Sequence, residues 1–269
     1  MNATTIQPQK QFRALLLGET CIDRYVIGDV DRISPEAPIP ILSNPDRNES
    51  KGMAANVKRN LEALGFKVTF YTNKNTIIKT RFVDRKSGQQ ILRLDDGETV
   101  DEWQPWIGVY SGIDQNYDCV VISDYDKGFL TYDHITDLRN RCSLPIFIDT
   151  KKTNLAKFSG CIVKINETEY KKATSFPSGT LVVTKGASGA EYYHDDVLYL
   201  QYTAPTVNVV DVCGCGDTFL AALAALCVIE PSDLGGWTPV QAASLTATKR
   251  GTYAPTLQEI DSFVRQLDK

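Results

Sequence analysis

The chain has 269 residues, 42% of them hydrophobic and 23% charged, which is typical of a soluble globular protein. This length is sufficient for one large α/β domain or two small ones, and we expect one. The net charge of -4 and the pI near 5.3, without any dense run of Lys and Arg, argue against a nucleic-acid-binding surface. Chemistry on small molecules fits this composition better.

Targeting and redox signals are weak. No apolar stretch reaches the roughly 20 residues that a membrane-spanning helix needs, so no membrane partner is expected. Residues 1–11 are polar and predict a disordered tail rather than a signal peptide. Seven cysteines and two histidines, with no Cys-x-x-Cys pair, support neither a disulfide framework nor a zinc site. We expect a cytoplasmic protein whose cysteines are reduced thiols, mostly in the core.

The chain begins its folded part with a strand and a flap. Residues 12–17 form an apolar run that ends at Gly18, as expected of a buried parallel strand. Residues 32–40 read RISPEAPIP, and their three prolines exclude a helix or a central strand. An extended edge or flap is what remains.

Helices and strands then alternate. Further strands are predicted at 68–71, 119–123, 145–149, 161–165 and 180–184. Helices are predicted at 58–64, 102–113, 132–142, 239–250 and 257–267. A hairpin is expected from 76–83 and 89–95 around a turn at 86–88, and a local antiparallel pair within 191–200. This rhythm implies a mostly parallel sheet with right-handed crossovers.

The most informative stretch is residues 211–218, which read DVCGCGDT and precede an apolar helix. Its glycines allow a tight turn, and the helix start behind them attracts anions. Asp217 in the first turn suits phosphoryl transfer, because the loop can hold the phosphoryl group while the carboxylate takes a hydroxyl proton. Asp217 acting only as a helix cap is the alternative. A P-loop motif is absent, and Phe219 stands where a dinucleotide fingerprint has its third glycine.

Polar side chains follow the predicted strands. Asp23 either orients a sugar through its hydroxyls or forms an ion pair with Arg24. The amide of Asn56 either meets a ligand hydroxyl, or faces solvent or caps the helix. The hairpin concentrates four cations, which either protect a sheet edge or grip a phosphorylated substrate. They are Lys79, Arg81, Arg85 and Arg93.

Several stretches together resemble the ribokinase-like (PfkB) carbohydrate kinases, from Leu15 to Thr256. They are GETCIDRY at 18–25, RISPEAP at 32–38, GMAAN at 52–56, SDYDKG at 123–128, NETE at 166–169, TKG at 184–186 and DVCGCGD at 211–217. The runs at 32–38 and 123–128 are similar to the branch that phosphorylates D-glycero-β-D-manno-heptose 7-phosphate at O1. The loop at 211–217 marks only the superfamily.

The resemblance implies a fold and a reaction. The fold is an α/β three-layer sandwich over residues 12–269, with a mostly parallel central sheet and a small β-sheet lid from about 25–42 and 76–95. In the family this lid commonly pairs across a homodimer. The reaction uses ATP and Mg²⁺, with Asp217 as the base and with Gly214, Cys215 and Gly216 as the anion hole.

The resemblance also implies binding roles. The sugar hydroxyls would be held by Asp23, Arg24, Gly52 and Asn56. The distal phosphate of a sugar phosphate would meet Lys79, Arg81, Arg93 and Lys127. On the nucleotide side, Asn166 and Glu169 would order Mg²⁺ through its waters, and Thr184, Gly186 and Gly189 would line the ATP site.

The chain departs from the family pattern. Met53 replaces a usual second glycine, Cys215 replaces alanine or glycine, and a late-helix asparagine falls on about Val240 or Gln241. Only residues 72–75 stand where the family has a helix and a strand. Three functions therefore remain open: a trimmed sugar kinase, a non-catalytic sugar- or nucleotide-binding protein that regulates a partner, or a kinase for another acceptor such as a nucleoside or a hexose phosphate. We also expect the helix start to lower the pKa of Cys213 or Cys215.

Overall fold

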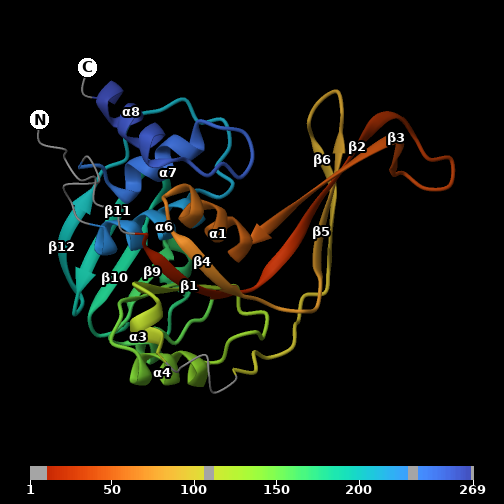
Figure 1. Ribbon diagram of the computed structural model, residues 1–269. Coiled ribbons are helices and arrows are strands. Elements are labelled where there is room, and N and C mark those ends of the chain that lie inside the picture. The colour runs from red at the N-terminus through yellow and green to blue at the C-terminus, as the bar shows by residue number, and fades with distance from the viewer. Residues whose placement is uncertain (1–10, 106–111, 230–235, 268–269) are drawn as a thin grey trace, which may run out of the picture.

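The computed structural model describes residues 11–105, 112–229 and 236–267 (Figure 1). Of the predicted N-terminal tail, residues 1–10 lie outside this range. The described chain forms one large sheet covered by helices and a second, smaller sheet that projects from it (Figure 1). This arrangement confirms the predicted α/β class with a mostly parallel main sheet and a separate small sheet.

The large sheet has eight strands in the order β12-β11-β10-β9-β8-β7-β1-β4. Its strands are β1 (Arg13–Gly18), β4 (Lys67–Tyr71), β7 (Cys119–Asp124), β8 (Ile146–Thr150), β9 (Ile162–Asn166), β10 (Thr180–Thr184), β11 (Ala190–His194) and β12 (Val197–Tyr202). The six strands β1, β4, β7, β8, β9 and β10 pair in parallel. The other two strands, β11 and β12, add an antiparallel edge. Because parallel strands end at a common edge, the loops after β1, β7, β8, β9 and β10 meet there.

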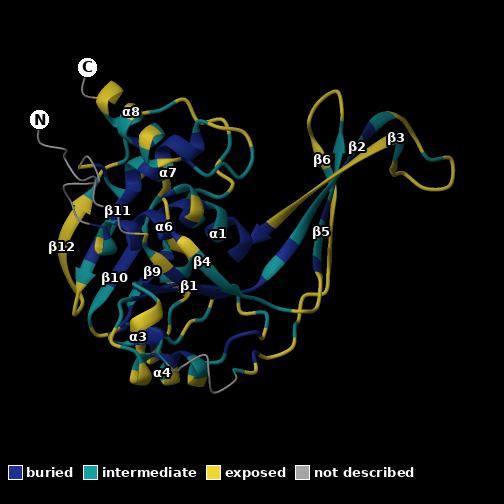
Figure 2. Ribbon diagram, in the orientation of Figure 1, coloured by how far each residue is buried: buried dark blue, intermediate teal, exposed yellow. Residues whose placement is uncertain are grey.

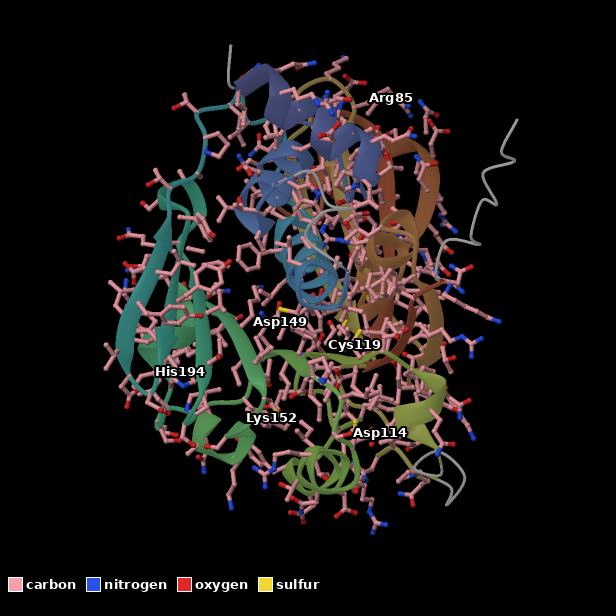
Figure 3. The ribbon with its side chains drawn as sticks, turned by 60° about the vertical axis from the view of Figure 1, so that its left-hand side comes forward. Arg85, Asp114, Cys119, Asp149, Lys152 and His194 are labelled. Carbon is pink, nitrogen blue, oxygen red and sulfur yellow. The ribbon has the colours of Figure 1, made fainter. Side chains whose placement is uncertain are left out.

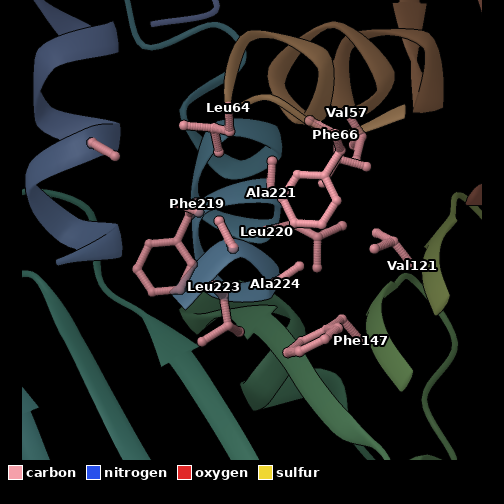
Figure 4. Packing of buried hydrophobic residues seen from close by; sticks show 14 of the residues in the cluster. Val57, Leu64, Phe66, Val121, Phe147, Phe219, Leu220, Ala221, Leu223 and Ala224 are labelled. Atoms are coloured by element: carbon pink, nitrogen blue, oxygen red, sulfur yellow. The ribbon is translucent and has the colours of Figure 1, made fainter. Parts of the chain in front are cut away.

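Both faces of the large sheet are covered, as the apolar runs predict (Figure 2). Side chains alternate along β1, so Leu16 packs into one core and Leu15 into the other. The first core lies under α1 (Ala54–Ala63), α6 (Cys215–Val228), α7 (Pro239–Ala247) and α8 (Leu257–Leu267). Figure 4 shows Leu220 and Ala224 of α6 packed among Val121 and Phe147 of the strands. The opposite face carries α3 (Ile113–Asn116) and α4 (Tyr132–Arg141).

The small sheet has the order β3-β2-β5-β6, and we call it the lid. Its strands are β2 (Thr20–Ile33), β3 (Pro40–Met53), β5 (Ile77–Asp84) and β6 (Gln90–Asp96). The hairpin of β5 and β6 lies where the alternation predicted it, and the proline-rich run forms the turn between β2 and β3. β3 runs back along β2 to Met53, so the lid also contains residues 43–53. These are mostly polar and were left unassigned by the sequence pattern.

Two expectations need correction. The helix predicted at 102–113 is wrong for 102–105, which form no helix, and 106–111 lie outside the described residues. The backbone at Trp103 instead bonds to a distant segment, because its N–H donates to Phe129 O at 2.8 Å. All seven cysteines are free thiols, as expected, but only Cys21, Cys119 and Cys161 are buried.

The short connection after β4 leaves the main sheet intact. β4 is an edge strand, and β5 pairs with β2 in the lid rather than extending the main sheet. Because the missing helix and strand would lie beyond this edge, their absence leaves the strands of the main sheet in place. The described chain also contains no helix long and apolar enough to cross a membrane.

Candidate active site

The site is centred on Asp217, in the first turn of α6. Gly214 is the N-cap residue, with φ of 83°, and no side chain in the described chain caps this turn. The carboxylate is instead engaged across the molecule, because Asn56 Nδ2 in the first turn of α1 donates to Asp217 Oδ2 at 2.7 Å. A Cβ on Gly214 would lie 2.7 Å from the same amide nitrogen. Asp217 is therefore not the helix cap, and glycine at 214 makes room for the Asn56 contact.

The electrostatic setting of Asp217 suits a base. Burial is the main cause that raises its pKa to about 6, and the Asn56 hydrogen bond acts against it. The charge of Asp149 raises this pKa further, whereas Lys164 and Lys151 lower it. At neutral pH the carboxylate is mostly ionised, yet it is a stronger base than an exposed aspartate.

Lys164 and Asp149 belong to this site and were not singled out from the sequence. Lys164 on β9 is only 3% exposed, and its Nζ lies 2.6 Å from Asp149 Oδ2 at the end of β8. A Cβ on Gly216 would stand 3.2 Å from that Nζ, so the ammonium lies against the glycine loop. Figure 3 labels Asp149 inside the body of the molecule. The available signal was a lysine inside the apolar run 161–165.

Glu19 fixes a neighbouring loop. Its buried carboxylate accepts from the backbone N–H groups of Tyr125 at 2.8 Å and Lys127 at 3.0 Å. The Tyr125 hydroxyl consequently stands 3.5 Å from Asp217 Oδ1, longer than a normal hydrogen bond. Lys79 Nζ, from the lid, lies 5.6 Å from the centre of the Tyr125 ring. The loop thus joins the lid to the N-terminal end of α6.

The lid presents Asp23 and Arg81 on one face. Arg81 Nη1 lies 2.6 Å from Asp23 Oδ1. A Cβ on Gly52 would overlap Asp23 Oδ2, so a larger residue at position 52 would displace this carboxylate. Arg24 does not join them, because successive residues of a strand point to opposite faces, and its Nε pairs with Glu49 Oε1 at 2.6 Å. The alternative of an Asp23–Arg24 ion pair is therefore wrong, and the Arg24 side chain lies on the opposite face of the lid from Asp23.

The other predicted phosphate-binding cations have acidic partners. Arg93 is opposite Arg81 in the strand register and binds both oxygens of Asp95 at 2.7 Å. Lys127 pairs with Glu98. Within the described chain, Lys79 has no carboxylate partner and is the least neutralised of these side chains.

A pocket of about 570 Å³ opens beside the glycine loop. Its lining includes Thr184, Gly186 and Gly189 together with Cys215 and Gly216, so the structure brings these predicted positions together. Gly189 also has a packing role, since a Cβ there would overlap the Tyr202 carbonyl oxygen. The remaining walls are largely apolar.

The late-helix position that the family fills with asparagine also lies here. Val240 is part of the pocket lining. Gln241 does not line the pocket, and its side chain caps α7 instead. Its Oε1 accepts from Thr238 N at 2.8 Å in the capping box of that helix. This side of the pocket is therefore apolar rather than amide-lined.

Asn166 and Glu169 form the capping box of α5 (Glu167–Lys172). The Asn166 side chain accepts from Glu169 N at 2.9 Å, and Glu169 Oε2 accepts from Asn166 N at 2.8 Å. The second oxygen of Glu169 contacts Lys151 Nζ. The described residues contain no group of three or more acidic, His or Cys side chains that could hold a metal alone. Asn166 and Glu169 alone would therefore suit a cation that is held mainly by water and phosphate, as Mg²⁺ commonly is.

The expected low pKa at the helix start is wrong. Burial and the nearby Asp211 carboxylate raise the pKa of Cys215 to about 11. Burial and the Asp211 hydrogen bond likewise raise the pKa of Cys213. Acidic neighbours and desolvation outweigh the helix dipole at both thiols.

The chain is similar to known carbohydrate kinases. Residues 148–259 match the family described as pfkB family carbohydrate kinase. The chain is 29% identical, over 317 aligned positions, to a D-beta-D-heptose 7-phosphate kinase from Bordetella bronchiseptica, covering 97% of this chain and 98% of the relative. The chain belongs to the PfkB family of carbohydrate kinases.

Other relatives of this PfkB chain are longer. It is 30% identical to the bifunctional protein HldE of Nitratiruptor sp. over 312 positions, covering 96% of this chain but 66% of the relative. For HldE of Rhodospirillum rubrum the share is 62%. The chain thus spans about two thirds or less of these bifunctional relatives. Because 312 aligned positions exceed 269 residues, the aligned part of the relative contains segments that this chain lacks.

Solved structures confirm the ribokinase-like fold of the PfkB chain. A ribokinase from Arabidopsis thaliana, complexed with ribose and ATP, superposes with a TM-score of 0.72 at 16% identity, covering 95% of this chain and 99% of the other. Phosphofructokinase-2 from Escherichia coli gives 0.68 at 16% identity, covering 97% and 100%.

Proposed function

We propose that the protein is an ATP-dependent kinase that transfers the γ-phosphoryl group to a hydroxyl of a phosphorylated sugar. The proposed acceptor is a heptose 7-phosphate, the sugar phosphate in the name of the Bordetella relative, and the proposed acceptor atom is its O1. The proposal is carried by the placement of the Asp217 carboxylate beside a glycine loop and a buried lysine, under a lid that bears cations.

Asp217 is the proposed base. Its raised pKa makes it a better proton acceptor than an exposed aspartate while leaving it mostly ionised at neutral pH. Asn56 donates to Oδ2, which orients the carboxylate and leaves Oδ1 to receive the proton of the acceptor hydroxyl. Tyr125, near Oδ1, covers the carboxylate on the lid side.

The proposed anion hole is the loop of Gly214, Cys215 and Gly216. Within the described chain, the N–H groups of Gly216 and Asp217 have no acceptor, as expected at a helix start. These donors and the Lys164 ammonium point to where negative charge grows on the transferred group. Asp149 holds that ammonium in place at 2.6 Å.

The nucleotide is proposed to occupy the pocket lined by Thr184, Gly186 and Gly189, whose apolar walls suit an adenine ring. Mg²⁺, when bound with ATP, neutralises phosphate charge and aligns the phosphates. We assign its waters to Asn166 and Glu169, and add Asp149, whose Oδ1 forms no hydrogen bond or ion pair in the described chain. A cytoplasmic location follows from the need for ATP.

The acceptor is proposed to lie between Asp217 and the lid. Asp23, Gly52 and Asn56 would hold its hydroxyls. Its distal phosphate would meet the cationic face of the lid, where Lys79 is available and Arg81 and Arg93 adjoin one another. Lys127 is a further candidate, once released from Glu98.

The lid is also the proposed dimer contact. Four large apolar side chains are exposed on it, which is unfavourable in water and favours association with a second copy. They are Ile33, Ile39, Leu92 and Leu94.

An ADP-release assay with ATP and Mg²⁺ across unphosphorylated sugars and sugar phosphates tests the function. We expect turnover with heptose 7-phosphate and none with unphosphorylated heptose, and a phosphorus NMR signal at O1 of the product. Phosphate transfer to another position would overturn the O1 assignment. ATP binding without turnover on any sugar would instead support the non-catalytic binding protein.

A further inference from the structure

A second cavity lies beside the N-terminal half of α1. It measures about 380 Å³ and is bounded by the end of β4, the connection 72–76, the base of the lid and α1. It shares no lining residue with the nucleotide pocket, and neither Asp23, Asn56 nor Asp217 lines it. Its position beside an edge strand keeps it separate from the site described above.

The charge of this edge cavity is one-sided. Its lining contains four cationic side chains from three separate segments and, among the described residues that form it, no aspartate or glutamate. They are Lys51, Lys58, Arg59 and Lys74. Lys58 is neutralised by Glu62 at 2.6 Å, but neither Lys51 nor Lys74 has an acidic partner in the described chain. Cations gathered without counter-charges attract a polyanion.

Arg59 forms the inner wall and is incompletely satisfied. Its Nε is buried without a hydrogen-bond partner in the described chain, which is unfavourable for a charged donor. Its Nη2 donates to Thr252 Oγ1 at 2.8 Å and to Asn56 Oδ1 at 3.0 Å. The same Asn56 side chain donates to Asp217. One guanidinium therefore links the edge cavity to the amide that orients the proposed base.

We propose that the edge cavity is a binding site for a small phosphate-bearing metabolite, and that its occupation acts on Asn56 through Arg59. The volume lies within the range of small-molecule pockets, and phosphate oxygens suit both the free ammonium groups and an arginine with an unused N–H. An anion that binds the Arg59 guanidinium weakens the hydrogen bond from Arg59 to Asn56 Oδ1. The orientation of the Asn56 amide toward Asp217 then changes.

Equilibrium dialysis of labelled pyrophosphate against the full chain tests the site. A saturating non-hydrolysable ATP analogue with Mg²⁺ keeps the nucleotide pocket filled. We expect the variant Lys51→Glu with Lys74→Glu to bind one pyrophosphate fewer than the wild type, or to bind it with about tenfold or more lower affinity. Lys67→Glu, an exposed charge reversal on β4 outside the cavity, is the matched control and should bind as the wild type does.

Equal stoichiometry and affinity in the wild type and the double variant would overturn the site. The link to Asn56 has its own readout in the side-chain amide NMR signal of that residue. Pyrophosphate should shift this signal in the wild type and not in the double variant, and an identical response in both would overturn the link. Neither measurement requires turnover, so a failed kinase assay leaves both results interpretable.

Discussion

The amide of Asn56 and the carboxylate of Asp217 share a 2.7 Å hydrogen bond although 161 positions separate them. The contact joins the first turns of two helices, α1 and α6, that lie on the same face of the main sheet. It stabilises the ionised carboxylate against the effect of burial. The pH range in which Asp217 is ionised therefore depends on a residue far away in the sequence.

The pH dependence of kcat/KM should show this coupling. The pKa of Asp217 is about 6, so activity should fall as the pH drops below about 6, because the base must be ionised. Asn56→Ala removes the hydrogen bond that lowers this pKa, and the acidic limb should move to higher pH. Rates measured from pH 5 to 9 check this. If the acidic limb stays at the same pH in the variant, Asn56 does not affect the ionisation of Asp217.

Asp217→Asn should stabilise the fold at neutral pH. The folded pKa, about 6, lies above the unfolded value of 3.8, so ionisation of Asp217 disfavours the folded state. This unfavourable effect is absent below about pH 3.8, grows between 3.8 and 6, and is complete above 6. Chemical denaturation should give a gain of about 1–2 kcal/mol at pH 8 and none at pH 3.5. A variant less stable than the wild type at pH 8 would contradict the burial of this charge.

Gly214→Ala should impair catalysis more than folding. Alanine at φ of 83° is strained by about 1 kcal/mol, and its Cβ would displace the Asn56 amide. Gly65→Ala is the matched control, because Gly65 has φ of 89° with nothing within 4 Å. Both variants should lose similar stability, but only Gly214→Ala should lose about tenfold or more in kcat. Equal kcat in the two variants would remove the steric role of Gly214.

Thiol labelling should find Cys215 slow. With a pKa raised to about 11, roughly one thiol in a thousand is ionised at pH 8. Reaction with a disulfide reagent should therefore be far slower than that of free cysteine under the same conditions. Mass spectrometry of peptides labelled over time resolves Cys215 from the other thiols. Labelling as fast as free cysteine would restore the sequence-based expectation of a reactive thiol.

Much of the fold followed from local patterns in the sequence. The apolar runs at 161–165 and 180–184 predicted β9 and β10 within one residue, because strands buried on both faces need continuous apolar side chains. The lid was only partly predictable. Residues 43–53 of β3 are largely exposed, so pairing with β2 rather than burial makes them a strand.

The site was harder to predict, because its partners come from distant segments. Asp217 and its loop have a local signature, whereas Lys164 is visible only as a charge inside an apolar strand. The sequence left an ion pair with the neighbouring Arg24 open as the alternative to a sugar-binding role of Asp23. The strand period sends adjacent side chains to opposite faces, and Arg81 on β5 pairs with Asp23 instead.

The most direct test of Asp217 as the base compares Asp217→Asn with the wild type in two measurements: kcat on the sugar phosphate, and ATP affinity. Asparagine has a similar shape but cannot take a proton from the acceptor hydroxyl. We expect kcat to fall by roughly two to four orders of magnitude while ATP affinity stays nearly unchanged. A variant that retains the wild-type kcat would exclude Asp217 as the base and contradict the proposed mechanism.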